Sequence, residues 1–256
     1  MNITITGDAT EGDYNIFRVG GPKNTQIEVA IGHLTLKGGG GTAAQSRLSG
    51  GAIQSYADLT VGFCTLRDNN AVTGGAITAW SGKLTLTNCD LFNNEARNGG
   101  AIYINDKVTE VKITGGSIHD NTADSGDFEA RGGGIYISGG SKVPIDLKDV
   151  EIKQNKAKTG GGGIAVRNNI NGGGSPKLTL GVGTVIRNNS ATEAAAMGGG
   201  VYFGAGALAI DAGAVIYSNT AGSGGGLYRV TGTTWNSEDS NILYNESDNV
   251  ASGGGN

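Results

Sequence analysis

A tandem repeat of two short motifs constrains this chain more than any other feature. The first motif is a Gly-Gly pair followed by a small residue and an aliphatic one. It occurs at Gly50–Ile53, Gly74–Ile77 and Gly99–Ile102, and again, with Gly in third place, ending at Ile135, Ile164, Val201 and Leu227. The second motif is an aliphatic residue, two others and Asn. Its asparagines are Asn69, Asn94, Asn121, Asn155, Asn189, Asn219 and Asn245. A period of 25 to 34 residues indicates a solenoid of stacked units.

Short runs of alternating apolar and polar residues lie between the motifs. Examples are LTV at 59–61, LTLT at 84–87 and VKIT at 111–114. A period of two predicts strands, and no segment has a convincing helical period. A unit of this size cannot bury its own apolar face, so neighbouring units must stack. We therefore predict an all-β fold, a single right-handed parallel β-helix with about three strands per coil and about eight or nine coils.

The repeat indicates one domain that covers residues 1–256. Residues 50–256 carry the regular copies, and residues 1–49 form a less regular lead-in. The incomplete repeats at both ends predict a fragment of a longer protein, because solenoids need capping coils. Within each copy the glycines allow a sharp turn, and the seven asparagines are expected to form a hydrogen-bonded structural ladder along the stack.

Composition and charge exclude several other classes. The 48 glycines are clustered and there are only 3 prolines, which excludes collagen. A content of 37% hydrophobic residues supports a packed core rather than disorder. No apolar stretch is long enough for a membrane helix, so this segment is not expected to insert into a membrane. The net charge of -4, without a basic patch, argues against nucleic acid as a partner.

The paired motifs resemble a known bacterial repeat. Gly-Gly-Ala-Ile combined with Phe-x-x-Asn is the signature of the chlamydial polymorphic membrane protein repeat, and the resemblance covers about residues 50–256. This chain departs from the pattern because the Phe is replaced by Leu66, Leu91, Ile118, Ile152, Ile186, Ile216 and Ile242. Similar repeats occur in autotransporter-like passengers and adhesin-like surface proteins. The resemblance implies a non-catalytic, secreted or cell-surface module of adhesin type, with a glycan or protein receptor as its partner.

Strand alternation suggests where such a module would bind. Six aromatic residues are expected to share one exposed face and to form a ligand-binding surface together with insertions at 122–131 and 167–177. These residues are Tyr56, Trp80, Tyr103, Tyr136, Tyr202 and Tyr228. The alternative is that they are good strand formers stacked on a ladder. A second line along the stack is predicted for Thr4, Thr35, Thr60, Thr85 and Thr179.

Cys64 and Cys89 lie one coil apart, each five residues before its motif asparagine, so they are expected to stack. They form either a buried pair of small apolar side chains or a disulfide. Two thiols without a nearby His do not predict a metal site, and no cofactor is expected.

Two other function classes stay open. One is a polysaccharide-active lyase or hydrolase, in which acids of the 122–131 insertion would catalyse; these are Asp124, Asp127 and Glu129. A solvated acidic loop is the simpler interpretation, and the two histidines, His33 and His119, have no evident nucleophile in register. The other class is a self-assembling surface fibre, in which coil ends associate by end-to-end stacking.

Overall fold

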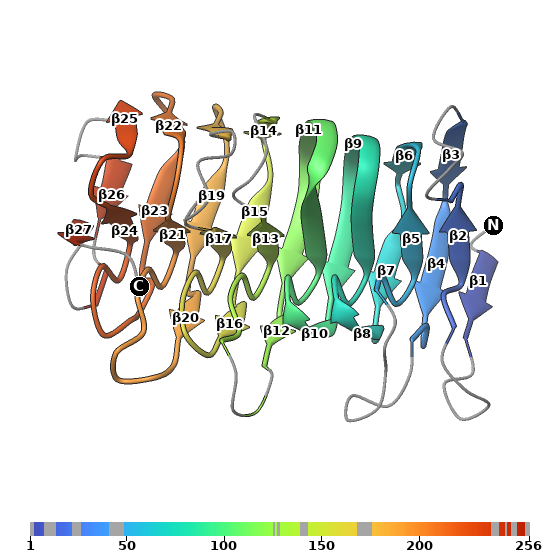
Figure 1. Cartoon of the computed structure of the whole chain (residues 1–256), viewed down its shortest axis with the longest axis horizontal. Coiled ribbons are helices and arrows are strands. Elements are labelled where there is room, and N and C mark those ends of the chain that lie inside the picture. The colour runs from blue at the N-terminus through green and yellow to red at the C-terminus, as the bar shows by residue number, and fades with distance from the viewer. Residues whose placement is uncertain are drawn as a thin grey trace.

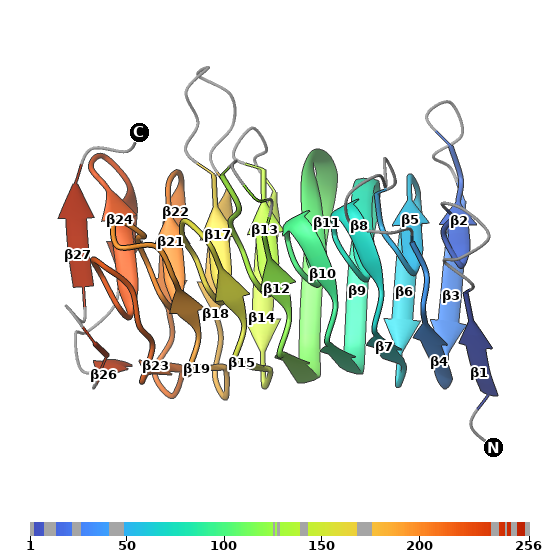
Figure 2. The same cartoon turned by 90° about the horizontal axis from the view of Figure 1, so that it is seen from below.

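The computed structural model describes residues 3–7, 14–21, 27–40, 49–124, 126, 129–138, 143–167, 176–236, 241–243, 245–246 and 250–253. Over these residues the chain winds into a parallel β-solenoid without an α-helix (Figure 1). The coils follow one another along a single axis, with β1 (Ile3–Thr6) and β27 (Val250–Gly253) at opposite ends (Figure 2). The all-β, parallel β-helix prediction is therefore confirmed.

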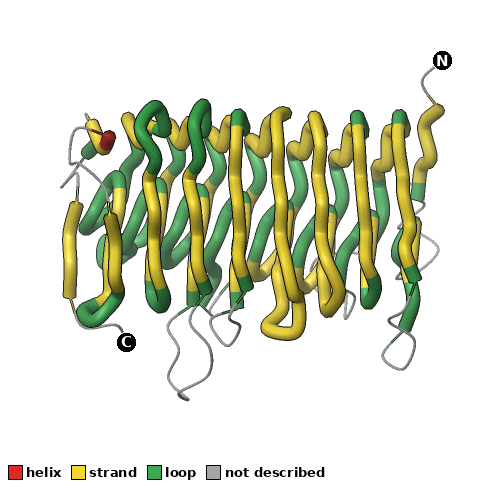
Figure 3. Tube along the Cα trace, turned by 90° about the horizontal axis from the view of Figure 1, so that it is seen from above, coloured by secondary structure: helices red, strands yellow, loops and turns green. Residues whose placement is uncertain are grey.

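Equivalent strands of successive coils pair in parallel and form four columns, which we name d, a, b and c in the order in which a coil visits them. Strands β9 (Ile77–Phe92) and β11 (Ile102–His119) run without a break through columns d, a and b. The remaining strands are short and alternate with turns at the corners of each coil (Figure 3).

Within the described residues, columns d and a contain the following strands. Besides β9, β11 and β27, column d contains β2 (Phe17–Val19), β5 (Ile53–Ser55), β13 (Ile135–Ile137), β17 (Ile164–Val166), β21 (Val201–Phe203) and β24 (Leu227–Val230). Besides β9 and β11, column a contains β3 (Glu28–Gly32), β6 (Asp58–Gly62), β14 (Pro144–Lys148), β18 (Lys177–Leu180), β22 (Ala207–Ile210) and β25 (Thr234–Asn236).

Columns b and c complete the coil. Besides β1, β9 and β11, column b contains β4 (Leu34–Lys37), β7 (Thr65–Arg67), β15 (Glu151–Lys153), β19 (Val185–Arg187), β23 (Val215–Tyr217) and β26 (Ile242–Leu243). Column c is a separate sheet of very short strands, β8 (Asn70–Thr73), β10 (Glu95–Asn98), β12 (Thr122–Ala123), β16 (Lys156–Ala157) and β20 (Ser190–Ala191). Column c adds a fourth strand to the three expected per coil. It escapes sequence analysis because two to four residues cannot display an alternation.

One continuous hydrophobic core fills the inside of the solenoid. The aliphatic residues of the second motif lie in column b and pair coil after coil, as Leu66 with Leu91 and Ile118 with Ile152. Both pairs are at most 1% exposed. Burying each such side chain contributes about 1.5–3 kcal/mol, so this column supplies a large part of the core.

The Gly-Gly pair is required by backbone geometry at the corner between columns c and d. Gly74 has a φ of 57°, and a Cβ there would lie 2.1 Å from the Ile77 carbonyl oxygen. A Cβ on Gly75 would lie 2.3 Å from the carbonyl oxygen of Gly100, its counterpart in the next coil. The first glycine therefore makes the turn, and the second permits the coils to approach each other.

The predicted threonine line is correct for Thr60, Thr85 and Thr179, which lie in column a, and wrong for Thr4 and Thr35. Thr4 pairs with Thr35, which pairs with Thr65, and all three lie in column b. Thr60 and Thr85 pair with each other in column a. The single line splits because both columns contain alternating runs that look alike, and only the pairing shows which column each run occupies.

Candidate functional site

The six aromatic side chains predicted to share a face do come together on the outer side of column d and its flanks. We call them the ring column. Tyr56 stacks on Trp80 with ring centroids 6.3 Å apart, and Trp80 lies 5.9 Å from Tyr103. Tyr103 stacks on Tyr136 at 5.3 Å, and Tyr202 stacks on Tyr228 at 5.8 Å. Parallel in-register pairing produces the Tyr103–Tyr136 and Tyr202–Tyr228 stacks, because the paired strands place these tyrosines at equivalent positions of successive coils.

The expectation that the whole ring column is exposed is wrong. Tyr136, Tyr202 and Tyr228 are only 7%, 1% and 7% exposed. The Gly-Gly corner folds the end of column c back over the start of column d, so Met197 packs against this tyrosine cluster. Tyr56, Trp80 and Tyr103 remain partly exposed. Three rings of the ring column are therefore buried packing residues, and only the three N-terminal rings reach the surface.

Burial also changes the acidity of these phenols. Loss of solvation raises the pKa of Tyr136 to about 12, with a further contribution from Tyr103. Burial likewise raises the pKa of Tyr103 and of Tyr202, although Arg131 opposes the shift at Tyr202. The hydroxyl groups thus stay neutral, because a phenolate would lie in an apolar environment.

Arg131 completes the ring column where a ring is missing. Ala165 occupies the position between Tyr136 and Tyr202 in the pairing. The Arg131 guanidinium lies 4.5 Å from the centre of the Tyr202 ring, with its side chain almost fully buried. Glu129 accepts a hydrogen bond from Arg131 at 3.2 Å. The acidic insertion therefore neutralises a buried cation that stacks on a ring.

Other parts of the predicted loop surface are only partly described. Asp127 and residues 168–175 of the 167–177 insertion lie outside the described residues. Asp124 accepts a hydrogen bond from the backbone of Gly126 and shapes a turn. Among the residues that the structure describes, no three His, Cys, Asp or Glu side chains gather as metal ligands.

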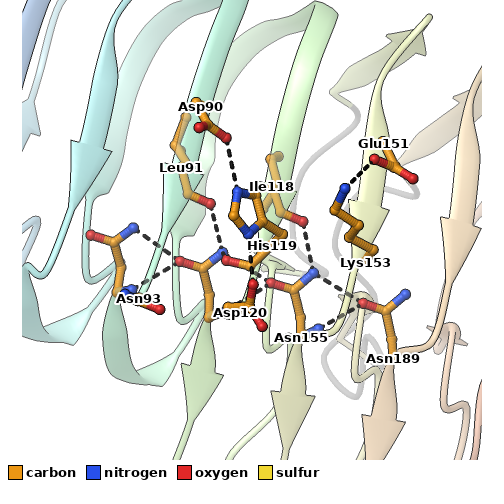
Figure 4. Close-up of polar contacts among 12 residues, drawn as sticks. Asp90, Leu91, Asn93, Ile118, His119, Asp120, Glu151, Lys153, Asn155 and Asn189 are labelled. Atoms are coloured by element: carbon orange, nitrogen blue, oxygen red, sulfur yellow. Dashed lines mark hydrogen bonds and ion pairs between the residues drawn. The ribbon is translucent and has the colours of Figure 1, made fainter.

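The seven motif asparagines form a continuous chain of hydrogen bonds at the corner between columns b and c, which is buried from Asn69 to Asn219. Asn155 donates from Nδ2 to Asn189 Oδ1 at 3.0 Å, and its own Oδ1 accepts from Asn121 Nδ2 at 2.9 Å (Figure 4). Each Nδ2 also donates to a backbone carbonyl of the preceding coil, as Asn155 does to Ile118. The six ladder residues from Asn69 to Asn219 each follow a residue in left-handed conformation, and these preceding residues are Asp68, Asn93, Asp120, Gln154, Asn188 and Ser218.

His119 belongs to a charged cluster that sequence analysis missed. Its Nε2 lies 3.0 Å from Asp90 Oδ1 and its Nδ1 lies 2.7 Å from Asp120 Oδ2 (Figure 4). The imidazole also stacks on Phe92 at 5.0 Å. In the next coils Glu151 pairs with Lys153 and with Arg187. Asp90 and His119 are 29 residues apart, so only the register of the coils brings them together.

Cys64 and Cys89 are both buried free thiols in neighbouring coils. Cys89 donates to the Val61 carbonyl at 3.3 Å, and Cys64 donates to the Gly62 carbonyl at 3.3 Å. Burial raises the pKa of both thiols. The two side chains thus act as small core residues with weak hydrogen bonds.

Comparison with known proteins supports the broad fold family. Residues 23–172, more than half of the 256-residue chain, match the family described as right handed beta helix region. No curated protein and no solved structure matches the chain. Within the described part of the chain, no helix is long and apolar enough to cross a membrane. The solenoid and the family match agree, and the chain belongs to the right-handed beta helix family.

Proposed function

We propose that the chain is a non-catalytic stalk and binding module of a secreted or cell-surface protein of adhesin type, related to the chlamydial repeat. The observation that carries this proposal is the partly exposed end of the ring column, Tyr56, Trp80 and Tyr103, on an otherwise rigid solenoid. The contacts of Trp80 with Tyr56 and Tyr103 hold these side chains in place, so little conformational entropy is lost when a partner binds.

The polar clusters support a binding role more than a catalytic one. Both ring nitrogens of His119 already contact carboxylates, and Glu129 pairs with Arg131. A general base needs a free acceptor within reach of its substrate, and a nucleophile needs a base beside it. The ring column, in contrast, offers aromatic edges, phenol hydroxyls and an indole, which are enriched where proteins recognise partners.

Binding of the labelled chain to glycan arrays and to cultured cells tests the proposal. The double variant Tyr56→Ala/Trp80→Ala should abolish saturable binding, because it removes two of the three partly exposed rings. Phe92→Ala is the matched control, since Phe92 is a partly exposed ring on column b that stacks on His119. Equal binding by the double variant and the wild type would refute the assigned surface. Release of reducing sugar from a bound glycan would refute the non-catalytic role.

A further inference from the structure

The outer face of column a is hollowed at the N-terminal end of the solenoid. A groove of about 430 Å³ lies across β3, β6 and β9. Among the residues that line it, we call the charged Glu28, Asp58 and Lys83 the rim and the small Ala30, Thr60 and Thr85 the floor. Small-molecule sites have volumes of roughly 300–1,000 Å³, so the groove is large enough for a few sugar rings.

Two glycines lie beside the groove, two residues beyond Ala30 and Thr60 on the same strands, and the backbone does not require them. Gly32 and Gly62 pair with each other at the ends of β3 and β6, and neither has a positive φ. A Cβ on Gly62 would meet nothing closer than 4.0 Å, and one on Gly32 nothing closer than 3.5 Å. The next coil has Thr87 at the same position. The missing side chains therefore shape the surface rather than the backbone.

An aromatic pair follows directly after these two glycines. His33 follows β3 and Phe63 follows β6, and their rings stack 5.1 Å apart and within 2° of parallel. Phe63 is 55% exposed and has a φ of 53°. Bulky residues rarely adopt the left-handed conformation. At the equivalent position of the next two coils the left-handed residues are Asn88 and Gly115. An exposed ring held in a strained conformation suggests a functional role.

The groove thus combines an apolar ring with convergent polar groups. Glu28 and Asp58 pair in register, so their carboxylates emerge from neighbouring strands, and the backbone nitrogen of Lys83 donates to Asp58 Oδ1 at 2.8 Å. Carboxylates accept hydrogen bonds from hydroxyl or ammonium groups. Two carboxylates against one ammonium give the rim a net negative charge, which disfavours acidic sugars.

We propose that this groove binds a neutral or amino-substituted oligosaccharide. Sugar hydroxyls would bond to the rim and to Thr60, and the C–H face of a pyranose would pack on Phe63. The site lies on column a, apart from the ring column of the proposed adhesin surface, and does not depend on that function.

Calorimetric titration of the full chain tests the proposal with three probes: hexa-N-acetylchitohexaose, its deacetylated form and hexagalacturonate. We expect saturable binding of at least one of the first two and none of the third. Gly62→Thr should abolish binding, because it fills the open surface between Thr60 and Phe63 with the side chain that the next coil carries as Thr87. Phe63→Gly should weaken binding at least about tenfold while relieving backbone strain, so its melting temperature should be unchanged or higher.

Two controls separate this site from other effects. Asn88→Gly makes the same backbone change in the next coil, away from the rings, and should bind as the wild type does. Phe92→Ala, which removes a partly exposed ring on column b, should also leave the affinity unchanged. The proposal is overturned if no chitohexaose form binds, if only hexagalacturonate binds, or if Gly62→Thr and Phe63→Gly both bind like the wild type.

Discussion

Asn155 lies in the middle of the asparagine ladder and is fully buried. Its side chain takes part in four hydrogen bonds. It donates to the Ile118 carbonyl at 2.9 Å and to Asn189 Oδ1 at 3.0 Å, and it accepts from the backbone nitrogen and from Nδ2 of Asn121. The substitution Asn155→Ala removes all four and leaves the Asn121 backbone N–H buried without its acceptor.

The expected loss of stability follows from these contacts. Four hydrogen bonds at about 1 kcal/mol each, plus about 1–2 kcal/mol for the unsatisfied N–H, amount to about 5 kcal/mol. Native domains have unfolding free energies of roughly 5–15 kcal/mol, so this single change should remove a large part of the stability. For a chain of this size the melting temperature should fall by about 10–20 °C.

Thermal and urea unfolding followed by far-ultraviolet circular dichroism measures this loss. Asn155→Asp should be at least as damaging, because it keeps the acceptor but places a buried carboxylate beside the Ile118 carbonyl. Asn188→Gly is the control, since Asn188 is exposed and has a φ of 54°, and it should stay within about 1 kcal/mol of the wild type. A loss below about 1.5 kcal/mol for Asn155→Ala would refute the reasoning that the ladder stabilises the stack.

Three further outcomes are expected. Gly75→Ala should destabilise the chain by at least about 3 kcal/mol in urea unfolding, because its Cβ would lie 2.3 Å from a carbonyl oxygen, whereas Gly62→Ala should be neutral or slightly stabilising; equal effects would contradict the corner geometry. Burial raises the pKa of Tyr136 to about 12, above the unfolded value near 10, so its stabilisation is complete below pH 10 and lost towards pH 12; Tyr136→Phe should flatten that part of the stability curve, and an unchanged slope would count against it. Mass spectrometry of the unreduced chain should find Cys64 and Cys89 as two thiols that iodoacetamide labels only after unfolding, and a mass lower by two hydrogens would show a disulfide instead.

The architecture could be predicted because its determinants are local and repeated. Leu66 and Leu91 point inward because inward and outward residues alternate along a strand, and the pair Gly74–Gly75 indicates a turn that only glycine can make. The repeat distance then places each residue above its counterpart, so the stacking of Asn69 on Asn94 follows from the sequence once parallel coils are assumed. Column c could not be predicted because its strands are too short to show an alternation of apolar and polar residues.

The surface could not be predicted in the same way. Alternation tells which side of a strand a side chain leaves, but not what packs upon that side. Tyr202 leaves the outer side of column d as predicted, yet the fold-back of column c buries it. The contacts of His119 with Asp90, and the groove across Asp58 and Thr60, likewise depend on register between coils of unequal length.

The sequence by itself therefore determined the solenoid, its core and its ladder, since each is set by short-range patterns that recur in every coil. Only the tertiary structure decided which aromatic rings reach solvent and where a groove opens. Those properties arise where neighbouring coils differ, and a difference between coils becomes a surface feature only after the coils are stacked.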